Sequence, residues 1–342
     1  MAKFSYEELL KQEVKFDDGI KGKKIMLYGT NDTGKTYQAC HFPKPLLIMT
    51  EAGGSAVSCP KVDCTDKWSE FKDVVDDICK NVDKYRDILQ TVVIDTAENL
   101  VKLSERAICN EFDVRDLSEI TGKQNGYNLA RTDFQTQINR LTAKGYTVIF
   151  ICHEEVVEKE DEVTGEKFNF TQPKGTSNEK SSMRMLRDLV DFCIYTRPNG
   201  IDADTFETIQ STGICKRTKN VFARSRFAIQ TIVNPFNAEN AIKAIEDAVK
   251  KSAEMEGTTV GASAPKKQMT KEDYFDLIKP YVKKLMKVCG EEVTAIVESA
   301  LGEGRKVTSA TDDELVKLDN IYNNLVTKAT LLGVEVNEDN VD

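Results

Sequence analysis

The amino-acid sequence predicts an α/β protein with a mostly parallel central sheet flanked by helices, plus a small C-terminal helical module. Three observations lead to this prediction. Five short apolar runs recur with helical patterns between most of them, which is typical of a parallel sheet covered by helices. A glycine-containing loop joins the first run to a helix-forming segment. Beyond about residue 257 the composition changes to small, uncharged residues, and only helical patterns follow.

The predicted strands are short and rich in β-branched and aliphatic residues. They lie at Ile25–Tyr28, Leu46–Thr50, Thr91–Asp95, Thr147–His153 and Asp191–Thr196. The polar segment Glu154–Ser181 is predicted to be a β-hairpin or a mobile loop. Phe206–Ser211 and Arg226–Ile232 are predicted to be further strands in antiparallel pairing. Asn237 is expected to cap a helix that runs to about Lys251.

Length and composition indicate two units. At 342 residues the chain exceeds the size at which a single core stops growing. Residues 257–265 have the composition of a flexible linker. Beyond them, one helical face carries the apolar residues Phe275, Ile278, Val282, Leu285 and Met286, and a second amphipathic pattern spans residues 312–332. The expected organisation is a core at 1–252, a flexible linker at 253–269, a helical module at 270–332 and an acidic tail at 333–342.

The composition excludes several classes of protein. A formal net charge of −9 argues against a surface coated with basic residues that grip duplex nucleic acid. No apolar run approaches the roughly 20 residues that cross a bilayer, and the start lacks the pattern of a secretory signal. Nine cysteines fit a reducing compartment, and their spacing is not that of a zinc site. We therefore expect a cytoplasmic protein that has no membrane partner and no structural metal.

Residues 29–36 read GTNDTGKT, a full Walker A loop. Gly29 and Gly34 allow a tight turn whose N–H groups face phosphates, Lys35 meets the β- and γ-phosphates, and the Thr36 hydroxyl suits Mg²⁺. The loop follows the first apolar run and precedes a predicted helix from Lys35 to about His41. The predicted nucleotide-binding residues are Gly29, Thr30, Asn31, Asp32, Thr33, Gly34, Lys35, Thr36 and Tyr37, with ATP and Mg²⁺ as the expected ligands.

The predicted strand at residues 91–95 ends in an aspartate, which is the Walker B arrangement. Asp95 is expected to hold Mg²⁺, directly or through water. Hydrolysis also needs a group that orients or deprotonates water. Glu51, which follows the neighbouring strand, is the first candidate, and Glu98 is its competitor, although Glu98 also fits the first turn of a helix. His153 ends another strand, where it either contacts the γ-phosphate or is a capped edge residue.

The densest basic cluster of the chain comprises Lys216–Lys219 together with Arg224 and Arg226. Its guanidinium groups suit the stabilisation of phosphate charge on a neighbouring subunit. The same cluster also fits a solvated strand edge that deters aggregation.

The order of these elements resembles the RecA-type core of phage Sak-like recombination ATPases, a branch of the AAA-type proteins. The resemblance covers about residues 20–250 and includes the segment Ala223–Phe227. It implies a RecA-like P-loop ATPase core in which Glu51 is the catalytic glutamate and His153 senses the γ-phosphate. It also implies that Arg224 and Arg226 reach the site of the adjacent subunit in a homo-oligomer, either a ring or a filament.

The same resemblance implies an ATPase, stimulated by DNA, that assembles on single-stranded DNA and promotes annealing or recombination in the host cytoplasm. Partners would include a single-strand-binding protein or other recombination proteins. Two loops combine cations with aromatic residues, as single-strand binding requires. The predicted DNA-binding residues are Lys123, Tyr127, Arg131, Lys167, Lys174 and Lys180.

Two other functions use the same phosphate loop. One is a nucleotide-gated loader or interaction ATPase that acts by docking and has no annealing activity of its own. The other is a small-molecule phosphotransferase, which needs an arginine-rich lid over the phosphates, whereas residues 154–166 are rich in glutamate. These acidic residues also depart from what a DNA-binding loop needs, because they repel phosphate.

Overall fold

The computed structural model describes residues 16, 19–51, 57–121, 125–261, 271–311, 314–334 and 336. These residues fall into two compact units, one within Lys15–Ser263 and the other within Ala264–Asp342. We call them the core unit and the C-terminal unit, and we describe each by itself. Among the described helices, none combines the length and the apolar composition needed to cross a bilayer.

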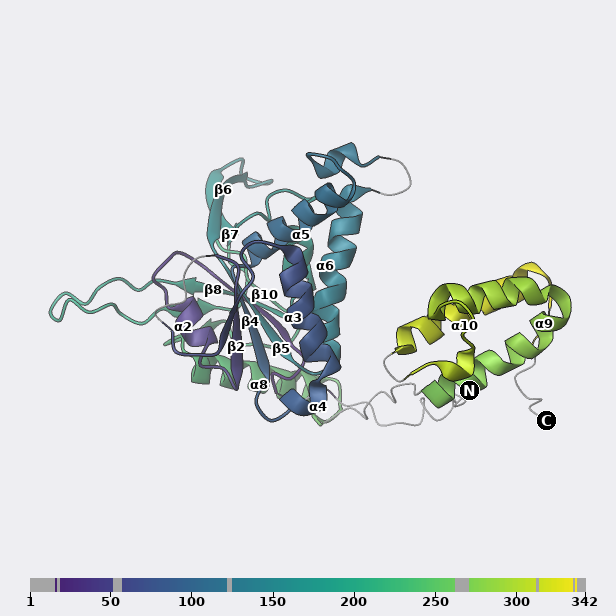
Figure 1. The fold of residues 1–342 in the computed structure, drawn as a ribbon. Coiled ribbons are helices and arrows are strands. Elements are labelled where there is room, and N and C mark those ends of the chain that lie inside the picture. Colours follow the sequence, from purple (N-terminus) through teal and green to yellow (C-terminus); the bar gives the residue numbers. More distant parts are fainter. Residues whose placement is uncertain are drawn as a thin grey trace. The chain divides into compact units, whose positions relative to one another are not determined.

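The core unit is built on one sheet with the order β11-β9-β8-β1-β5-β4-β2-β3, and β10 pairs with β8 (Figure 1). Its parallel strands are β1 (Lys24–Tyr28), β2 (Pro45–Met49), β3 (Lys61–Asp63), β4 (Thr91–Asp95), β5 (Thr147–Cys152) and β8 (Phe192–Arg197). The α/β fold with a mostly parallel sheet is therefore confirmed. All five predicted strands are present, and β3 is an additional edge strand that the sequence pattern did not reveal.

Helices cover both faces of this sheet. One face packs against α3 (Trp68–Lys80), α5 (Ala97–Glu111), α6 (Gly126–Ala143) and α7 (Ser182–Leu189), and the other against α2 (Lys35–Ala39) and α8 (Ala238–Met255). Short helices α4 (Val82–Tyr85) and η1 (Leu117–Glu119) lie between these elements. Successive strand residues alternate between the two cores, as the pleat requires: Met26 and Tyr28 face one, and Ile25 and Leu27 face the other.

The antiparallel end of the sheet differs from the prediction. Its strands are β9 (Thr212–Ile214), β10 (Arg224–Ser225) and β11 (Ile232–Val233), all in antiparallel pairing. The predicted strand at 206–211 is wrong, because Phe206 has φ +59° and is not extended. Of the predicted strand at 226–232, only Ile232 lies in a strand, β11, because the chain between β10 and β11 turns at Phe227.

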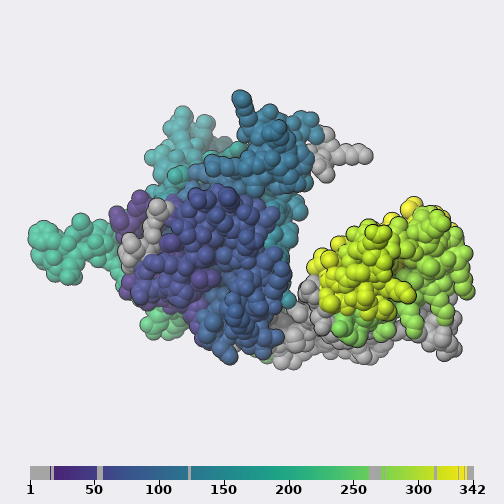
Figure 2. All heavy atoms as spheres, in the orientation of Figure 1, coloured from purple at the N-terminus to yellow at the C-terminus, as the bar shows by residue number. Residues whose placement is uncertain are grey.

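Two antiparallel projections extend from the core unit. The first is the hairpin β6 (Glu154–Glu160) and β7 (Lys167–Pro173), so the hairpin alternative is the one that forms. The second is the segment between β8 and β9, residues 198–211, which we call the β8–β9 arm (Figures 1 and 2). The arm contains an isolated antiparallel bridge between Ile201 and Thr208.

Asn237 caps helix α8 as expected, since its Oδ1 accepts from the Asn240 N–H at 2.8 Å. The helix continues to Met255, three residues into the predicted linker. Part of that linker is paired, because the Gly261 N–H donates to the Phe16 carbonyl at 3.0 Å. Residues 262–270 and most of the predicted acidic tail lie outside the described residues.

The C-terminal unit is helical, with α9 (Lys271–Leu301), η2 (Val307–Ser309) and α10 (Leu315–Leu331) around a core of its own. Helix α9 is kinked at Cys289, whose φ and ψ are −148° and 54°. Of the predicted apolar face, Ile278 and Leu285 are buried. Met286 is 48% exposed, because it lies about 100° around the helix from Leu285.

The centre of β5 provides a test of the core. Phe150 is fully buried, so Phe150→Ala is expected to lower the free energy of unfolding by about 3–5 kcal/mol through loss of burial and cavity formation. Trp68 is the only tryptophan of the chain and stacks on Phe134, so its fluorescence during urea unfolding reports on the core unit. Val163→Ala, at a position that is 94% exposed, should leave the transition unchanged. Equal midpoints for the two variants would contradict this packing.

Candidate nucleotide site

The phosphate loop lies between β1 and α2 and is packed against the neighbouring strand. A Cβ at Gly29 would lie 2.5 Å from the Thr196 carbonyl oxygen, so only glycine fits there. Gly34 has φ +75°, a conformation that glycine adopts without a steric cost. The hydroxyl oxygens of Thr33 and Thr196 lie 3.0 Å apart, and the Ser211 hydroxyl donates to the Thr33 carbonyl at 2.9 Å. Strand β8 and the arm that follows it therefore hold the loop in shape.

The two Walker motifs meet at the carboxyl ends of β1 and β4. The Thr36 hydroxyl donates to Asp95 Oδ2 at 2.6 Å. Lys35 Nζ donates to the Gly29 carbonyl at 3.1 Å and lies within hydrogen-bonding distance of the Thr30 carbonyl. The Lys35 ammonium thus lies next to Thr36 on the loop, and the Thr36 hydroxyl is paired with the carboxylate of Asp95 from β4.

Burial perturbs both charged groups of this site. It lowers the pKa of the Lys35 ammonium, while the nearby Asp95 carboxylate acts in the opposite direction. Burial also raises the pKa of Asp95, and the hydrogen bond from Thr36 and the charge of Lys35 oppose that rise. Each group therefore stabilises the charged form of the other in a desolvated setting.

The oxygen donors fit a magnesium ion. A hydroxyl and a carboxylate are hard ligands, and Mg²⁺ usually takes only one or two protein oxygens together with phosphate oxygens and water. Thr36 and Asp95 supply this pair within one hydrogen-bond length. Beside them, Gly34 is the N-cap of α2, and backbone N–H groups at such a turn are suited to binding phosphates.

A cavity of about 460 Å³ opens at this point. It is lined by Asn31, Asp32, Thr33, Gly34, Lys35, Thr36, Tyr37, Met49, Glu51, Val57, Asp95, Thr96, Ile151 and His153. The fold therefore brings most of the predicted nucleotide residues to one cavity, and Glu51 and His153 line it too. Gly29 and Thr30 complete the loop behind Lys35.

The two candidate glutamates occupy different settings. Glu51 lines the cavity, and its Oε2 accepts from Asn99 Nδ2 at 2.7 Å. Glu98 lies in the first turn of α5, as expected, but it is buried against His153. Its Oε1 lies 2.6 Å from His153 Nδ1 and accepts from the His153 backbone N–H at 3.2 Å. Glu51 is therefore the one positioned to reach a nucleotide, and Glu98 contacts the histidine.

The contact with Glu98 fixes the histidine ring. A carboxylate only accepts, so Nδ1 carries the proton and Nε2 is the nitrogen left for the cavity. The backbone of the same residue leads to the hairpin, because the His153 carbonyl accepts from the Lys174 N–H at 2.9 Å. His153 thus joins the cavity to the base of β6 and β7.

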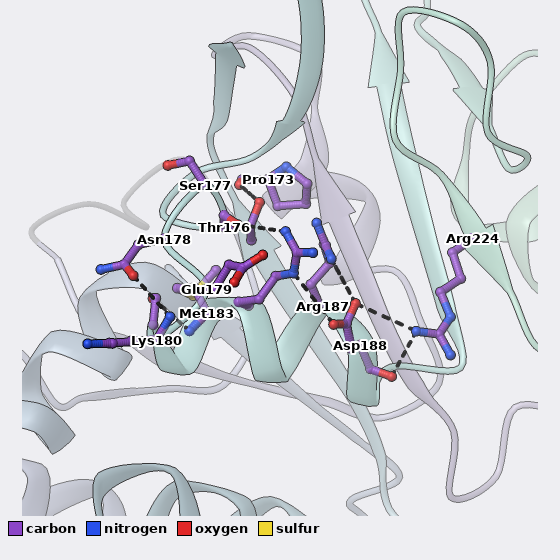
Figure 3. Close-up of polar contacts among 12 residues, drawn as sticks. Pro173, Thr176, Ser177, Asn178, Glu179, Lys180, Met183, Arg187, Asp188 and Arg224 are labelled. Atoms are coloured by element: carbon purple, nitrogen blue, oxygen red, sulfur yellow. Dashed lines mark hydrogen bonds and ion pairs between the residues drawn. The ribbon is translucent and has the colours of Figure 1, made fainter. Parts of the chain in front are cut away.

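The two arginines of the basic cluster lie toward the other end of β8. Arg224 is opposite Cys193, and its guanidinium donates to the Asp188 carbonyl at 3.0 Å (Figure 3). Arg226 donates to the carbonyls of Asp188 and Leu189, both at 3.3 Å. Both guanidiniums therefore satisfy the last carbonyls of α7, the anchoring role expected of cations at a helix end. Their role on a neighbouring subunit stays a prediction.

The structure brings together part of the predicted DNA-binding set. Tyr127 and Arg131 lie in the first turns of α6, and Arg131 donates to the Glu179 carbonyl at 2.8 Å. Lys180 Nζ lies 5.9 Å from the centre of the Tyr127 ring. Figure 3 shows Lys180 on the segment that leads into α7. These three residues form one surface, which we call the α6–α7 surface.

The other members of that set lie elsewhere. Lys167 is at the far end of β7 and pairs with Glu158 Oε1 at 2.7 Å. Lys174 is exposed at the base of the hairpin, next to His153 in the chain fold. Lys123 lies outside the described residues. The predicted residues therefore do not form a single site.

Sequence reasoning missed Thr196, Ser211 and Asn99, which brace the loop and Glu51. A signal was present for Thr196, a polar residue at the carboxyl end of a buried strand. Ser211 and Asn99 carried none, since hydroxyl and amide residues are common in loops and helices. Their roles arise only from strand order, which places β8 beside β1 for Ser211 and β4 beside β2 for Asn99.

A parallel sheet that carries a phosphate loop, a Walker B aspartate and a hydroxyl at hydrogen-bonding distance defines a P-loop nucleotide-binding protein. The sequence profile described as "AAA domain" matches residues 21–227. The chain is also 31% identical over 318 residues to the SPbeta prophage-derived uncharacterized protein YorG of Bacillus subtilis (strain 168), covering 90% of this chain and 94% of that relative. The chain belongs to the AAA domain family, whose members are P-loop ATPases.

The His153–Glu98 contact gives a prediction that needs no nucleotide. In the wild-type chain, long-range ¹⁵N–¹H correlation spectra should show His153 with its proton on Nδ1. Glu98→Gln removes an acceptor-only group, so the population of the Nε2–H tautomer should rise. His41 is the only other histidine, and His41→Asn gives the assignment. Glu111→Gln, an exposed acid at the end of α5, is the matched control. A wild-type ring protonated only on Nε2 would contradict this geometry.

Proposed function

We propose that this protein is a magnesium-dependent ATPase with a RecA-like core that assembles on single-stranded DNA and promotes annealing or recombination. The observation that carries the ATPase part is the 2.6 Å contact between the Walker A hydroxyl of Thr36 and the Walker B carboxylate of Asp95. These two groups together are what a triphosphate with its metal requires.

In the proposed reaction, this chain contributes binding and positioning. The amides of residues 31–35 bind the phosphates, and Lys35 turns from its carbonyl partners to the β- and γ-phosphates. Glu51 accepts the proton of the attacking water, and Asn99 orients its carboxylate. His153, held at Nδ1 by Glu98, donates to the γ-phosphate from Nε2–H, so both ring nitrogens carry a proton in this contact. Thr36 and Asp95 would hold Mg²⁺, which neutralises charge on the transferred phosphoryl group when bound.

The α6–α7 surface supports binding of single-stranded DNA. It combines an aromatic ring, Tyr127, with the cations Arg131 and Lys180, and single-strand sites use such stacking and charge. The segment that carries Lys180 also connects to the hairpin base, because Glu155 accepts from the Gly175 and Ser177 N–H groups at 3.0 and 2.8 Å. His153 is therefore connected to the segment that carries Lys180 through the backbone of β6 and these hydrogen bonds. A movement of His153 would be transmitted to the DNA-contacting residues through them.

Two further points support this proposal. The relative named above is prophage-derived by its description, and a phage recombination protein acts in the host cytoplasm. Arg224 and Arg226 lie toward the end of β8 that is remote from the chain's own phosphate loop. Any action of theirs on a triphosphate would therefore be on an adjacent copy, in a ring or filament that includes partners such as a single-strand-binding protein.

One observation favours a second candidate, a nucleotide-gated loader or interaction ATPase. The C-terminal unit contains an apolar groove of about 590 Å³ along α9, lined by residues that include Phe275, Val282 and Val297. A separate helical unit with such a groove suits docking on another protein. A small-molecule phosphotransferase has less support, because the hairpin that follows His153 carries Glu154, Glu155, Glu158 and Glu160 in place of arginines.

Steady-state hydrolysis tests the ATPase part. Lys35→Ala and Asp95→Asn should each lower ATP turnover by about a hundredfold or more, because each removes a charge that faces the phosphates or their metal. EDTA should abolish turnover in the wild-type chain. Lys102→Ala, at an exposed lysine of α5, should have no effect. The proposal fails if Lys35→Ala retains the wild-type rate.

Fluorescence titration with a labelled oligonucleotide tests the DNA part. Lys180→Ala should weaken binding several-fold and reduce the slope of log affinity against log salt by about 0.7, the share of one phosphate contact. Lys167→Ala is the matched control, because that lysine is neutralised by Glu158. Equal effects of the two variants, or no binding at low salt, would rule out the α6–α7 surface.

A further inference from the structure

The same tight turn occurs at the tips of both projections. In the hairpin, Asp161 Oδ1 accepts from the Val163 and Thr164 N–H groups at 3.0 and 2.9 Å. In the β8–β9 arm, Asp202 Oδ1 accepts from the Asp204 and Thr205 N–H groups at 3.0 and 2.8 Å. Each aspartate N–H also donates across the turn to a glutamate carbonyl, at 2.9 and 2.8 Å.

The two turns differ at the position that needs a positive φ. The hairpin has Gly165 there, with φ +73°, whereas the arm has Phe206, with φ +59°. A bulky residue in this conformation is strained relative to a conformation it prefers. Phe206 is nevertheless 83% exposed, so packing within the core unit does not offset this strain. A strained and exposed aromatic residue indicates a contact that another molecule completes.

The composition of the arm indicates which kind of molecule it contacts. Ile201 on the same arm is 66% exposed, so the arm exposes large apolar side chains. Asp202, Asp204 and Glu207 surround it, and residues 198–211 contain no lysine or arginine. A purely acidic tip repels phosphate, so nucleic acid is excluded as its partner. The arm fits a basic protein surface with an apolar hollow.

This chain carries such a surface. A cavity of about 460 Å³ lies beside β10, with Phe222, Phe227 and Ile229 among its apolar lining residues. Lys216, Arg217 and Arg224 contribute positive charge to it, and Asp188 is its single acid. Asp188 lies 3.7 Å from Arg224, so Lys216 and Arg217 give the cavity its net positive charge, which complements the acids of the arm. The hollow is large enough for an aromatic side chain.

The arm and this cavity lie at opposite ends of β8. The arm leaves the strand after Arg197, whereas Arg224 pairs with Cys193 near its beginning. We propose that the arm of one copy docks its Phe206 tip into the β10 cavity of the next copy. This proposal rests on the assembly part of the proposed function and deepens it. The contact is head-to-tail, so it builds a ring or an open filament and not a closed two-fold dimer.

The base of the arm links this contact to the nucleotide site. Asn199 Nδ2 donates to the Gln210 carbonyl at 2.6 Å and ties the two sides of the arm together. The next residue, Ser211, donates its hydroxyl to the Thr33 carbonyl of the phosphate loop at 2.9 Å. When a triphosphate changes the shape of the phosphate loop, Ser211 and the base of the arm move with it. Nucleotide binding is therefore expected to change the affinity between copies.

Phe206→Gly separates folding from docking. The substitution relieves the positive-φ strain, so the midpoint of urea unfolding should stay the same or rise. In sedimentation velocity, with and without ATP and Mg²⁺, the same variant should lose the higher oligomers of the wild-type chain. Lys216→Glu, on the cavity side, should lose them too. Val163→Ala, at the tip of the other projection, is the control and should assemble normally.

Mixing the two defective variants gives the decisive result. The Lys216→Glu chain keeps an intact arm, and the Phe206→Gly chain keeps an intact cavity. Together they should form a dimer that grows no further. Normal oligomers of Phe206→Gly, or no dimer in the mixture, overturn the proposed contact. A wild-type chain that stays monomeric at every concentration overturns it along with the assembly part of the proposed function, and the hydrolysis assay then tests the ATPase part separately.

Discussion

The nucleotide site exists because the carboxyl ends of parallel strands lie at one edge of their sheet. Thr36, which follows β1, and Asp95, at the end of β4, come from segments almost sixty residues apart. They meet because β5 is the only strand between β1 and β4 in the sheet order, and all three strands point the same way. His153 follows β5 and joins the same cavity. Loss of strand order would therefore scatter the site while leaving each motif intact.

Around this edge, each charged group is held by a neighbour from another element. Asn99 of α5 orients Glu51, and Glu98 of the same helix orients His153. Helix α5 thus acts on both groups that would face the attacking water and the γ-phosphate. Such supporting contacts matter because a positioned group loses less entropy on reaching its productive geometry.

The site also extends to the surface through two projections. The hairpin base is tied to His153, and the β8–β9 arm is tied to Thr33 through Ser211. Each projection therefore begins at a residue that the nucleotide would touch or displace. In our proposals, the hairpin leads from His153 toward DNA, and the arm leads from the phosphate loop toward a neighbouring copy.

The sequence correctly predicted the motifs and the sheet, because phosphate binding and strand burial both require particular residue types at short spacing. It failed for Phe206–Ser211, where a local turn overrode the strand pattern, and it assigned Glu98 no role beyond a general base or a helix first turn. Three contacts appear only in the folded chain: Glu98 contacts His153, Thr196 packs against Gly29, and Arg224 and Arg226 bond to the end of α7. These contacts join residues 36 to 168 positions apart, and no local pattern encodes them.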